Sequence, residues 1–150
     1  MKKYVSLILP AMLMLLMSGC GKKSEIINSE LAYKLNSELT FAEPLTELDD
    51  FAAEQRYGIN PGDYTELTAF VGTKGICDEF LIVKTPSVEG MTASLNEYLQ
   101  SKKTDYELYR PAEAGKLDNA IIEQYKDAVV MIITSDTENA RMIYTDYLKK

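Results

Sequence analysis

Apolar residues recur at every fourth position near the start of the folded part of the chain. Between residues 27 and 39 they are separated by polar and charged residues, and this spacing predicts an amphipathic helix. Pro44 interrupts the pattern, and a second short helix is expected from about Thr46, because acidic residues fill its first turns. The apolar positions of the first helix are Ile27, Leu31, Leu35 and Leu39.

Two segments typical of strands come next, at residues 64–71 and 76–84. The turn Gly72-Thr73-Lys74-Gly75 joins them, and we interpret the pair as a hairpin. The turn has the GxxG spelling of a nucleic-acid-binding KH loop, but its place between strands in an acidic chain favours a plain turn. Residues 76–83 and 128–133 are apolar at both parities, so both are expected to be central strands covered on two sides.

The remaining pattern is helix, connector, strand, strand, helix. Pro86 begins a predicted helix that runs to about Lys103, and a connector ends near Gly115. Residues 117–125 fit either a helix or a strand, and we choose a strand that precedes a tight Lys126-Asp127 turn. The strand at 128–134 leads to a final helix, whose predicted cap is Ser135 or Asp136.

These elements predict one α+β domain with a four-stranded antiparallel sheet, built from two strand-strand-helix units and preceded by amino-terminal helices. The first unit covers residues 64 to about 99, and the second covers 117–148. The helices of the two units are expected to cover one face of the sheet. The other face then needs the amino-terminal helices or a partner, which is where the predicted architecture bears on function.

The first residues have the pattern of an export signal. Lys2 and Lys3 precede an apolar run from Val5 to Met17, which is too short to cross a hydrocarbon core that needs about 20 residues. The following Ser18-Gly19-Cys20 completes the segment 16–20, which resembles the lipobox of bacterial lipoproteins. In that motif the Cys receives a diacylglyceryl group and becomes the mature amino terminus. The alternative is an ordinary secretory signal with an incidental Cys.

The predicted organisation of the chain therefore has three parts. Residues 1–19 are a lipoprotein signal peptide, residues 20–26 are the lipidated Cys20 with a short tether, and residues 27–150 are the folded domain. Two acyl chains anchor a protein stably, whereas one gives only marginal binding. We expect the protein on the outer face of the plasma membrane, held there through the lipid on Cys20.

Composition removes several classes of function. The chain has 16 Lys and Arg against 23 Asp and Glu, a formal net charge of −7, and no His. The absence of His excludes Ser-His-Asp and Cys-His catalysis and His zinc sites. The acidic balance argues against binding to nucleic acid, which needs clustered positive charge. The sequence also lacks GxSxG, SxxK, P-loop, GxGxxG and CxxC motifs, so we expect no enzyme and no cofactor.

A few residues remain as candidates for chemistry or contact. Cys77 has no cationic neighbour in sequence and is expected to be a buried structural thiol. Asp78 and Glu79 are adjacent on a strand, so their side chains should point to opposite faces and serve within the fold or as ligand contacts. Acidic residues at 47–50 and 136–138 lack the spacing of a calcium loop, and no metal site is expected. The candidate interaction or structural residues are Asp78, Glu79, Lys84 and Tyr109.

Tyrosine is abundant, with 10 residues in the chain. Several of these side chains could line a groove, although tyrosines more often half-bury the ring and leave the hydroxyl at the surface. The groove candidates are Tyr57, Tyr64, Tyr98, Tyr106 and Tyr109.

From about Leu31 onward the chain resembles a family of small lipoproteins of Gram-positive bacteria that is known only as a domain of unknown function. The resemblance implies an exported, membrane-anchored domain and supplies no activity. Where the family commonly has a Gly before the last strand, this chain has Lys126-Asp127. The matching residues are Tyr57-Gly58-Ile59, Tyr64-Thr65-Glu66, Cys77-Asp78-Glu79, Val83-Lys84, Tyr109-Arg110-Pro111, Val129 to Ile133 and Ser135-Asp136.

Three hypotheses for function follow. The first is a non-enzymatic interaction module that contacts an envelope protein or a second copy of itself. The second is a lipoprotein that binds a solute or peptide in a tyrosine-lined groove. The third is an enzyme that uses Glu79 or Lys84, which requires both groups to converge on one pocket.

Overall fold

Alternating apolar side chains on the two central strands organise the fold. The computed structural model describes residues 25–150, so the predicted signal peptide and Cys20 lie outside the described residues. All residues of β5 (Ala128–Ile133) are buried, as are those of β3 (Glu79–Lys84) except Lys84. Even-numbered side chains such as Phe80 contribute to one core cluster, and odd-numbered ones such as Leu81 contribute to the other. Both faces are covered, as the sequence predicts for these strands.

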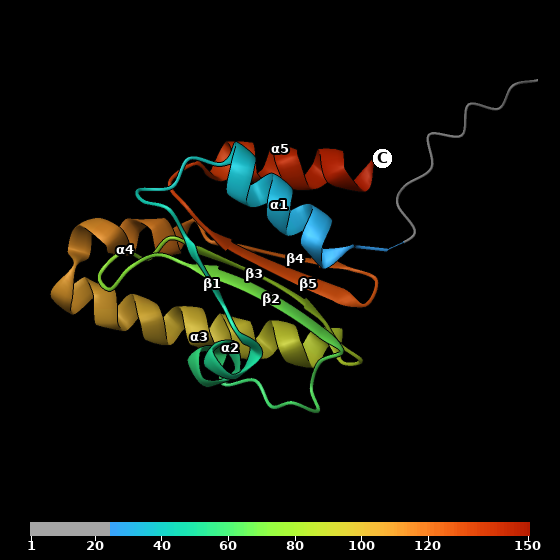
Figure 1. The fold of residues 1–150 in the computed structure, drawn as a ribbon. Helices are drawn as coiled ribbons and strands as arrows, with labels where there is room; N and C mark the ends of the chain where they lie inside the picture. The colour runs from blue at the N-terminus through green and yellow to red at the C-terminus, as the bar shows by residue number, and fades with distance from the viewer. Residues whose placement is uncertain (1–24) are drawn as a thin grey trace, which may run out of the picture.

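Five antiparallel strands form the sheet, in the order β1-β2-β3-β5-β4 (Figure 1). The inner strand pairs run in register over their full length, with Glu79 opposite Ile133 and Lys84 opposite Ala128. The three remaining strands are β1 (Thr46–Leu48), β2 (Glu66–Val71) and β4 (Ile121–Tyr125).

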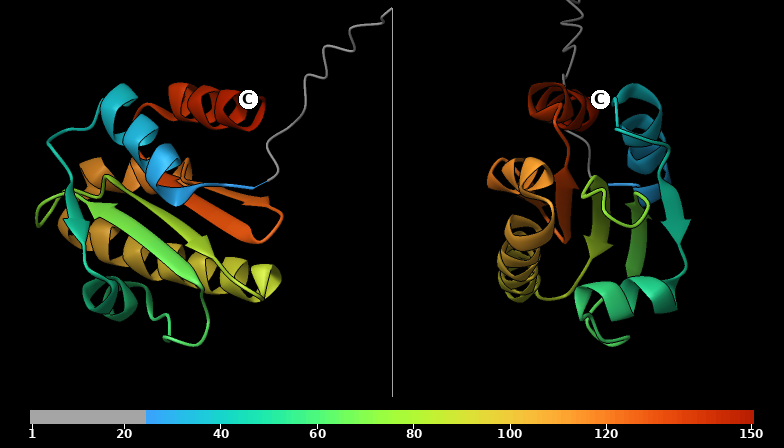
Figure 2. Two further views of the ribbon diagram at one scale, coloured as in Figure 1. Left: turned by 45° about the vertical axis from the view of Figure 1, so that its right-hand side comes forward. Right: turned by 90° about the vertical axis from the view of Figure 1, so that its left-hand side faces the viewer.

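Helices cover the sheet on both sides, as the two further views in Figure 2 show. The helices α1 and α5 lie side by side on one face, whereas α2, α3 and α4 belong to the opposite layer. No helix within residues 25–150 is both long enough and apolar enough to span a membrane. The helices are α1 (Asn28–Glu38), α2 (Asp50–Tyr57), α3 (Val88–Tyr109), α4 (Pro111–Asp118) and α5 (Thr137–Leu148).

The prediction of four strands is wrong by one strand. Residues 46–48, assigned from the sequence to the start of a helix, form the edge strand β1 and pair with residues 69–71 of β2. The helix begins four residues later, where the Asp49 carboxylate accepts a hydrogen bond from the Ala52 N–H at 2.8 Å. The acidic residues that suggested a helix start at Thr46 therefore include the true cap, but the residues before it are extended.

The prediction that the helices of the two strand-strand-helix units share one face is also wrong. Helix α3 packs on the side of Leu81, whereas α5 packs on the side of Phe80. Because β3 and β5 are antiparallel, the chain leaves them at opposite ends of the sheet before each helix. The sheet is thus covered by the chain's own helices on both faces.

The predicted connector before Gly115 is helical instead. Helix α3 continues to Tyr109, and Pro111 then occupies the first turn of α4. A proline cannot continue the hydrogen-bond ladder of the preceding helix, which explains why the break falls there. The predicted strand is confirmed for residues 121–125.

The β4–β5 turn places a lysine where glycine is favoured. Tyr125 pairs with Ala128, so the turn consists of Lys126 and Asp127, and Lys126 has a φ of 55°. A positive φ at the first turn residue alone is typical of a type II′ hairpin turn, whose first position usually holds Gly.

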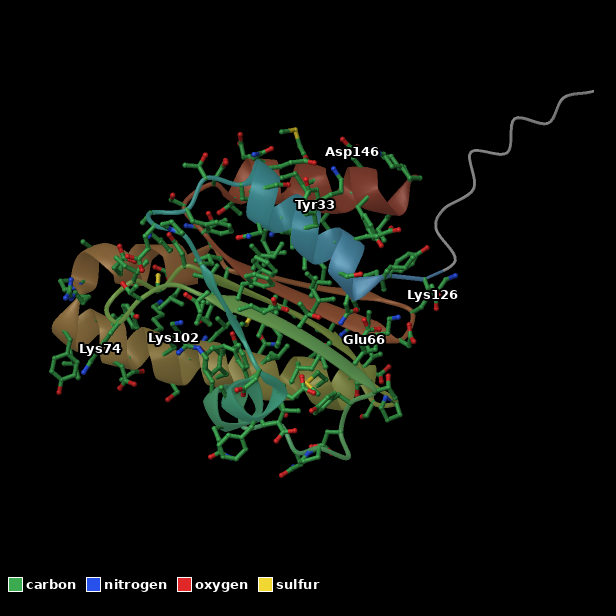
Figure 3. The ribbon with its side chains drawn as sticks, viewed as in Figure 1. Tyr33, Glu66, Lys74, Lys102, Lys126 and Asp146 are labelled. Atoms are coloured by element: carbon green, nitrogen blue, oxygen red, sulfur yellow. The ribbon has the colours of Figure 1, made fainter. Side chains whose placement is uncertain are left out.

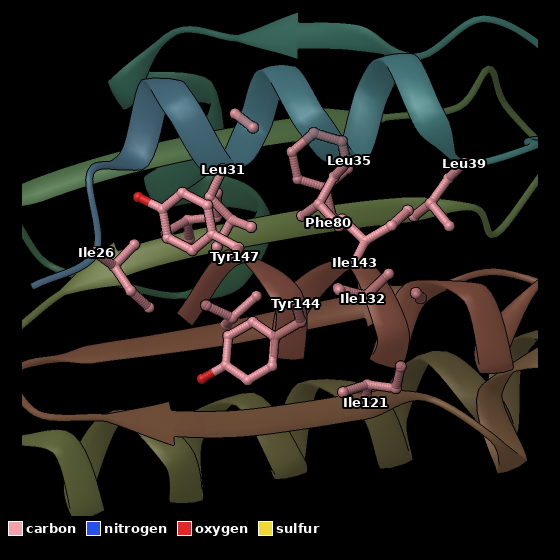
Figure 4. Packing of buried hydrophobic residues seen from close by; sticks show 14 of the residues in the cluster. Ile26, Leu31, Leu35, Leu39, Phe80, Ile121, Ile132, Ile143, Tyr144 and Tyr147 are labelled. Atoms are coloured by element: carbon pink, nitrogen blue, oxygen red, sulfur yellow. The ribbon is translucent and has the colours of Figure 1, made fainter. Parts of the chain in front are cut away.

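The first described residues are fixed in the core (Figure 4). Ile26 is fully buried among α1, α5 and the sheet. The Ile27 N–H donates to the Tyr147 hydroxyl at 2.9 Å, and the Asn28 side-chain amide donates to the Ile82 carbonyl at 3.1 Å. The chain therefore enters the folded domain at Ile26.

Candidate functional site

A cluster of charged and polar side chains lies at the end of the sheet where β3 begins. A hollow of about 560 Å³ lies there between α2, α3 and the loop from β2 to β3. This volume is within the range of small-molecule sites, about 300–1,000 Å³. We call it the loop hollow, and its walls include Arg56, residues 72–76, Tyr98, Ser101, Lys102, Asp105 and Tyr106.

A buried carboxylate organises the wall of the loop hollow. Glu79 is fully buried, and its Oε2 atom accepts hydrogen bonds from Arg56 Nη2 at 2.6 Å and Nε at 3.1 Å. The same oxygen accepts a bond from Lys102 Nζ at 2.6 Å, and Oε1 accepts one from the Tyr98 hydroxyl at 2.7 Å. Two cations thus share one carboxylate, which leaves this cluster with an excess of positive charge.

The pKa of Lys102 is lowered in this cluster, whereas the pKa values of Arg56 and Tyr98 are raised. Burial lowers the pKa of Lys102, which is only 7% exposed, and the Glu79 charge opposes that shift. Burial is the largest single effect on Arg56 and lowers its pKa, but Glu79, Tyr98 and Tyr57 together raise the pKa more, so the net shift is upward. Burial and Glu79 together raise the pKa of Tyr98, which therefore stays a hydroxyl donor.

Aromatic rings support the buried ammonium group. Lys102 Nζ lies 5.5 Å from the centre of the Tyr98 ring and 5.6 Å from that of the Tyr106 ring. Such distances allow a cation–π attraction. The Tyr57 ring packs edge-on against Tyr98, with ring centroids 4.9 Å apart. Tyr57 thus supports the Tyr98 side chain on the side away from the hollow.

Side chains from three segments hold the β2–β3 loop in place by hydrogen bonds. The Thr73 N–H donates to the Glu43 carboxylate, and the Cys77 N–H donates to Glu113 Oε2 at 3.0 Å. The Tyr106 hydroxyl donates to the Ile76 carbonyl at 3.1 Å. These bonds fix the loop relative to α3 and α4, so protein contacts alone hold the walls of the hollow in place.

A second hollow, of about 460 Å³, continues from the first along α3. The two share Lys74, Gly75, Asp105 and Tyr106 as lining residues. Gly75 has a φ of 99°, and a Cβ atom on it would lie 2.9 Å from Arg110 Nη2. The backbone conformation therefore requires glycine here, and any side chain at this position would also displace the flexible Arg110 side chain.

Asp78 belongs to a separate cluster that joins three segments. Its Oδ2 atom accepts a bond from the Ala42 N–H at 2.8 Å, and its Oδ1 atom pairs with Lys116 Nζ at 2.9 Å. Lys116 also pairs with Glu113 at 3.0 Å. Asp78 and Glu79 reach different partners, and only Glu79 belongs to β3, because the strand begins at that residue.

Among residues 25–150, one group could supply three metal ligands: Cys77, Asp78 and Glu113. Lys116 already provides a positive charge to both carboxylates of this group. Burial raises the pKa of the Cys77 thiol to about 12, with a further contribution from Glu113, so a thiolate ligand is disfavoured. Cys77 is buried, as predicted, and the group acts as a structural link between the loop and α4.

The other two predicted site residues lie apart from Glu79. Lys84 is at the far end of β3, where its ammonium pairs with Glu66 at 2.9 Å. Tyr109 is 80% exposed and borders the second hollow. The catalytic hypothesis requires Glu79 and Lys84 to converge on one pocket. In the structure they lie at opposite ends of β3 and do not converge.

Three of the five tyrosines proposed for a groove are brought together. Tyr98 and Tyr106 line the loop hollow, and Tyr109 borders its continuation. Tyr57 is buried behind Tyr98, and Tyr64 lies elsewhere, with its hydroxyl bonded to Glu54 at 2.7 Å. Hydrogen bonding to Glu54 raises the pKa of Tyr64 to about 12.

Sequence reasoning missed the cations of the site. Arg56 and Lys102 were not singled out, although Tyr98, Lys102, Asp105 and Tyr106 fall on one helical face at spacings of three and four. That signal was lost because the predicted helix stopped near Lys103 and left Tyr106 in a connector. The position of Arg56 depends on the tertiary approach of α2, for which the sequence carries no local signal.

Comparison with known proteins gives one match. No curated protein and no solved structure matches the chain. A family model described as a domain of unknown function, DUF4358, matches residues 38–134, which include β1 to β5, α2 to α4 and both hollows. The chain therefore belongs to the DUF4358 family.

Proposed function

We propose that this protein is a lipid-anchored extracytoplasmic protein whose domain binds a small solute in the loop hollow. The anchor part of the proposal rests on the lipobox-like segment 16–20 and on Cys20. The binding part rests on the geometry at the start of β3. Together they describe a non-enzymatic binding module held at the outer face of the plasma membrane.

The single observation that carries the binding part is a braced hollow with a charged, aromatic wall. Small-molecule sites are concave and largely preformed, and they place a few polar groups among apolar surface. Here Arg56, Lys102 and two tyrosines form the wall around a fully buried carboxylate. Taking charged groups such as Glu79 and Lys102 out of water costs free energy that their pairing often does not repay. A wall of this kind is better explained by ligand binding than by stability alone.

The coverage of the sheet weakens the leading alternative. The proposal of a partner on the sheet face depended on a face that the chain itself leaves open. Both faces are covered, by α1 and α5 on one side and by α2 and α3 on the other. A docking role now rests on Leu108 and Tyr109, which are 73% and 80% exposed at the end of α3. That pair favours contact with an envelope protein or a second copy as the second candidate function.

Filling the hollow tests the binding part directly. Ser101 lines the loop hollow, and its neighbour Gln100 is exposed on α3 but does not line either hollow. We expect Ser101→Trp to occupy the hollow, whereas Gln100→Trp adds the same side chain outside it. The full-length protein and both variants are screened in neutral detergent against mixed small solutes, by thermal unfolding.

A ligand that occupies the hollow should raise the melting temperature of the wild type and of Gln100→Trp, but not of Ser101→Trp. A ligand at 100 times its Kd stabilises by about 2.7 kcal/mol, which is easily measured. A screen in which every stabilising solute acts equally on all three proteins would contradict the proposal.

A further inference from the structure

We infer that the solute is a small dianion, a phosphomonoester or dicarboxylate, held between Arg56 and Lys102 in the loop hollow and two cations of the adjoining second hollow, Lys74 and Arg110, which we call the rim cations. This inference rests on the proposed function and assigns the chemical class of its ligand. It is carried by the charge balance around the hollow, by unused hydrogen-bond donors, and by two cations that have no ion-pair partner within residues 25–150.

The charge around the two hollows is opposite to that of the molecule. All 23 Asp and Glu residues lie within residues 25–150, whereas four of the 16 Lys and Arg residues precede them. The domain is thus more acidic than the whole chain. The hollows, by contrast, are lined by four cations, Arg56, Lys74, Lys102 and Arg110, and by one carboxylate, that of Asp105. The carboxylates of Glu79, buried behind two of these cations, and of Glu43, bonded to the Thr73 N–H, reduce the positive excess without cancelling it, which favours an anionic ligand.

The inner cations keep hydrogen-bond donors that Glu79 does not use. Arg56 bonds Glu79 through Nε and Nη2, and its Nη1 atom forms no hydrogen bond within the described residues. Lys102 has three donors and uses two, on Glu79 and on the Tyr98 hydroxyl at 3.3 Å. A fork of guanidinium and ammonium donors is the arrangement that binds phosphate and carboxylate oxygens.

The rim cations are the second observation. Most Lys and Arg side chains of residues 25–150 pair with a carboxylate, including exposed ones such as Lys34 and Lys149. Lys74 and Arg110 form no ion pair with any residue in this range, although the domain is rich in acids. Both line the second hollow, and Lys74 lines the first as well. In Figure 3, Lys74 and Lys102 lie at the same end of the molecule.

Tyrosine side chains complete the binding surface. Tyr106 lines both hollows, and Tyr109 borders the outer one. Their rings offer flat apolar contact for the body of an organic ligand, while the cations take its charged group. A phosphate or dicarboxylate that carries a ring or a short carbon chain should therefore bind more tightly than inorganic phosphate.

The rim cations also give a clean test, because both are exposed and neither forms an ion pair with another described residue. The probes are inorganic phosphate, phenyl phosphate, succinate and the neutral benzyl alcohol, added to full-length protein in neutral detergent at low salt and pH 7.5. Binding is measured by isothermal titration calorimetry. The variants are Lys74→Gln and Arg110→Gln, and Lys34→Gln is the control, because it removes one partly exposed positive charge from α1, away from both hollows.

We expect phenyl phosphate or succinate to bind at least about tenfold more tightly than benzyl alcohol, since charge-assisted hydrogen bonds distinguish them. Each rim variant should weaken binding by about two- to fivefold, and the control should change it less than that. Affinity should fall as salt is added. The relative affinities for phenyl phosphate and succinate identify which class of dianion the hollow prefers.

Three different results would overturn the inference. If benzyl alcohol binds as tightly as the anions and Ser101→Trp blocks it, the hollow binds solutes but the ligand is not a dianion. If the anions bind and all three charge variants weaken them equally, the attraction is a general charge effect and the assigned cations are wrong. If no probe binds and the solute screen is also empty, the proposed function fails together with the inference.

Discussion

Each of the two buried neighbouring carboxylates, Asp78 and Glu79, has a lysine partner of its own. Glu79 and Asp78 are adjacent and almost fully buried, yet each has its own lysine, Lys102 for the first and Lys116 for the second. Breaking such a pair leaves a buried charge without a counter-charge. The resulting loss of stability is far larger than that from breaking an exposed ion pair. The two clusters therefore differ in role: that of Asp78 is closed by its partners, whereas that of Glu79 borders a hollow and has donors to spare.

Removal of Lys116 tests the structural role of the Asp78 cluster. We expect Lys116→Met to lower the free energy of unfolding by about 2–3 kcal/mol, because Asp78 loses its counter-charge and Glu113 a partner. Lys149→Met, which breaks the exposed pair with Asp146, should change it by less than about 0.5 kcal/mol. Urea unfolding followed by circular dichroism measures both. Equal effects of the two variants would contradict this account.

The same variant has a pH signature. Burial lowers the pKa of Lys116, but Asp78 and Glu113 raise it more, so the folded pKa lies above the ordinary 10.5. A raised lysine pKa stabilises the fold fully below that ordinary value, and this contribution is lost as the pH rises through the folded pKa. The wild type should therefore lose stability at alkaline pH more steeply than Lys116→Met does.

At the scale of helices and strands, hydrophobic periodicity predicts most of the α+β fold. The doubly apolar segments 76–83 and 128–133 identify the two central strands, because only strands covered on both faces have that pattern. Periodicity does not distinguish a three-residue edge strand from the start of a helix, so β1 was missed. It also does not decide which face a helix covers, since that depends on the path of the chain after each strand.

The site was less predictable than the fold. Adjacency in the sequence marked Asp78 and Glu79, and the abundance of tyrosine marked Tyr98, Tyr106 and Tyr109, all of which lie in or beside the two clusters. The cations could not be found in the same way, because their meaning depends on distance across elements. Arg56 reaches Glu79 from 23 residues away in sequence, and only the folded chain shows that contact.

At the scale of the whole molecule, the loop hollow and the point where the chain enters the fold lie at opposite ends of the sheet. Lys84, close to Glu25, and Glu79 are at the two ends of β3, about 17 Å apart at the rise of an antiparallel strand. Figure 3 shows Lys126 and Glu66 near the start of the described chain, and Lys74 and Lys102 at the far end. With the proposed lipid on Cys20, the hollow would point away from the membrane.

This arrangement predicts that anchoring and solute binding are separable. We expect Cys20→Ala to lose the lipid and to leave the membrane fraction, or to remain unprocessed, because one residue carries the acyl chains. The Kd for phenyl phosphate should stay within about twofold of the wild type, since the hollow is built from residues at the other end of the sheet. Fractionation and calorimetry measure the two properties. A matured Cys20→Ala product that stays in the membrane would contradict the lipid anchor.

The most direct test of the central claim is to map the bound solute onto the fold. Backbone amide chemical shifts of the isotope-labelled full-length protein in neutral detergent would be followed while phenyl phosphate is added. The account predicts saturable shifts at residues 72–76 and along the face of α3 that carries Lys102 and Tyr106, with α1 and α5 unchanged. Shifts confined to other surfaces, or no saturable shift at the loop hollow, would contradict it.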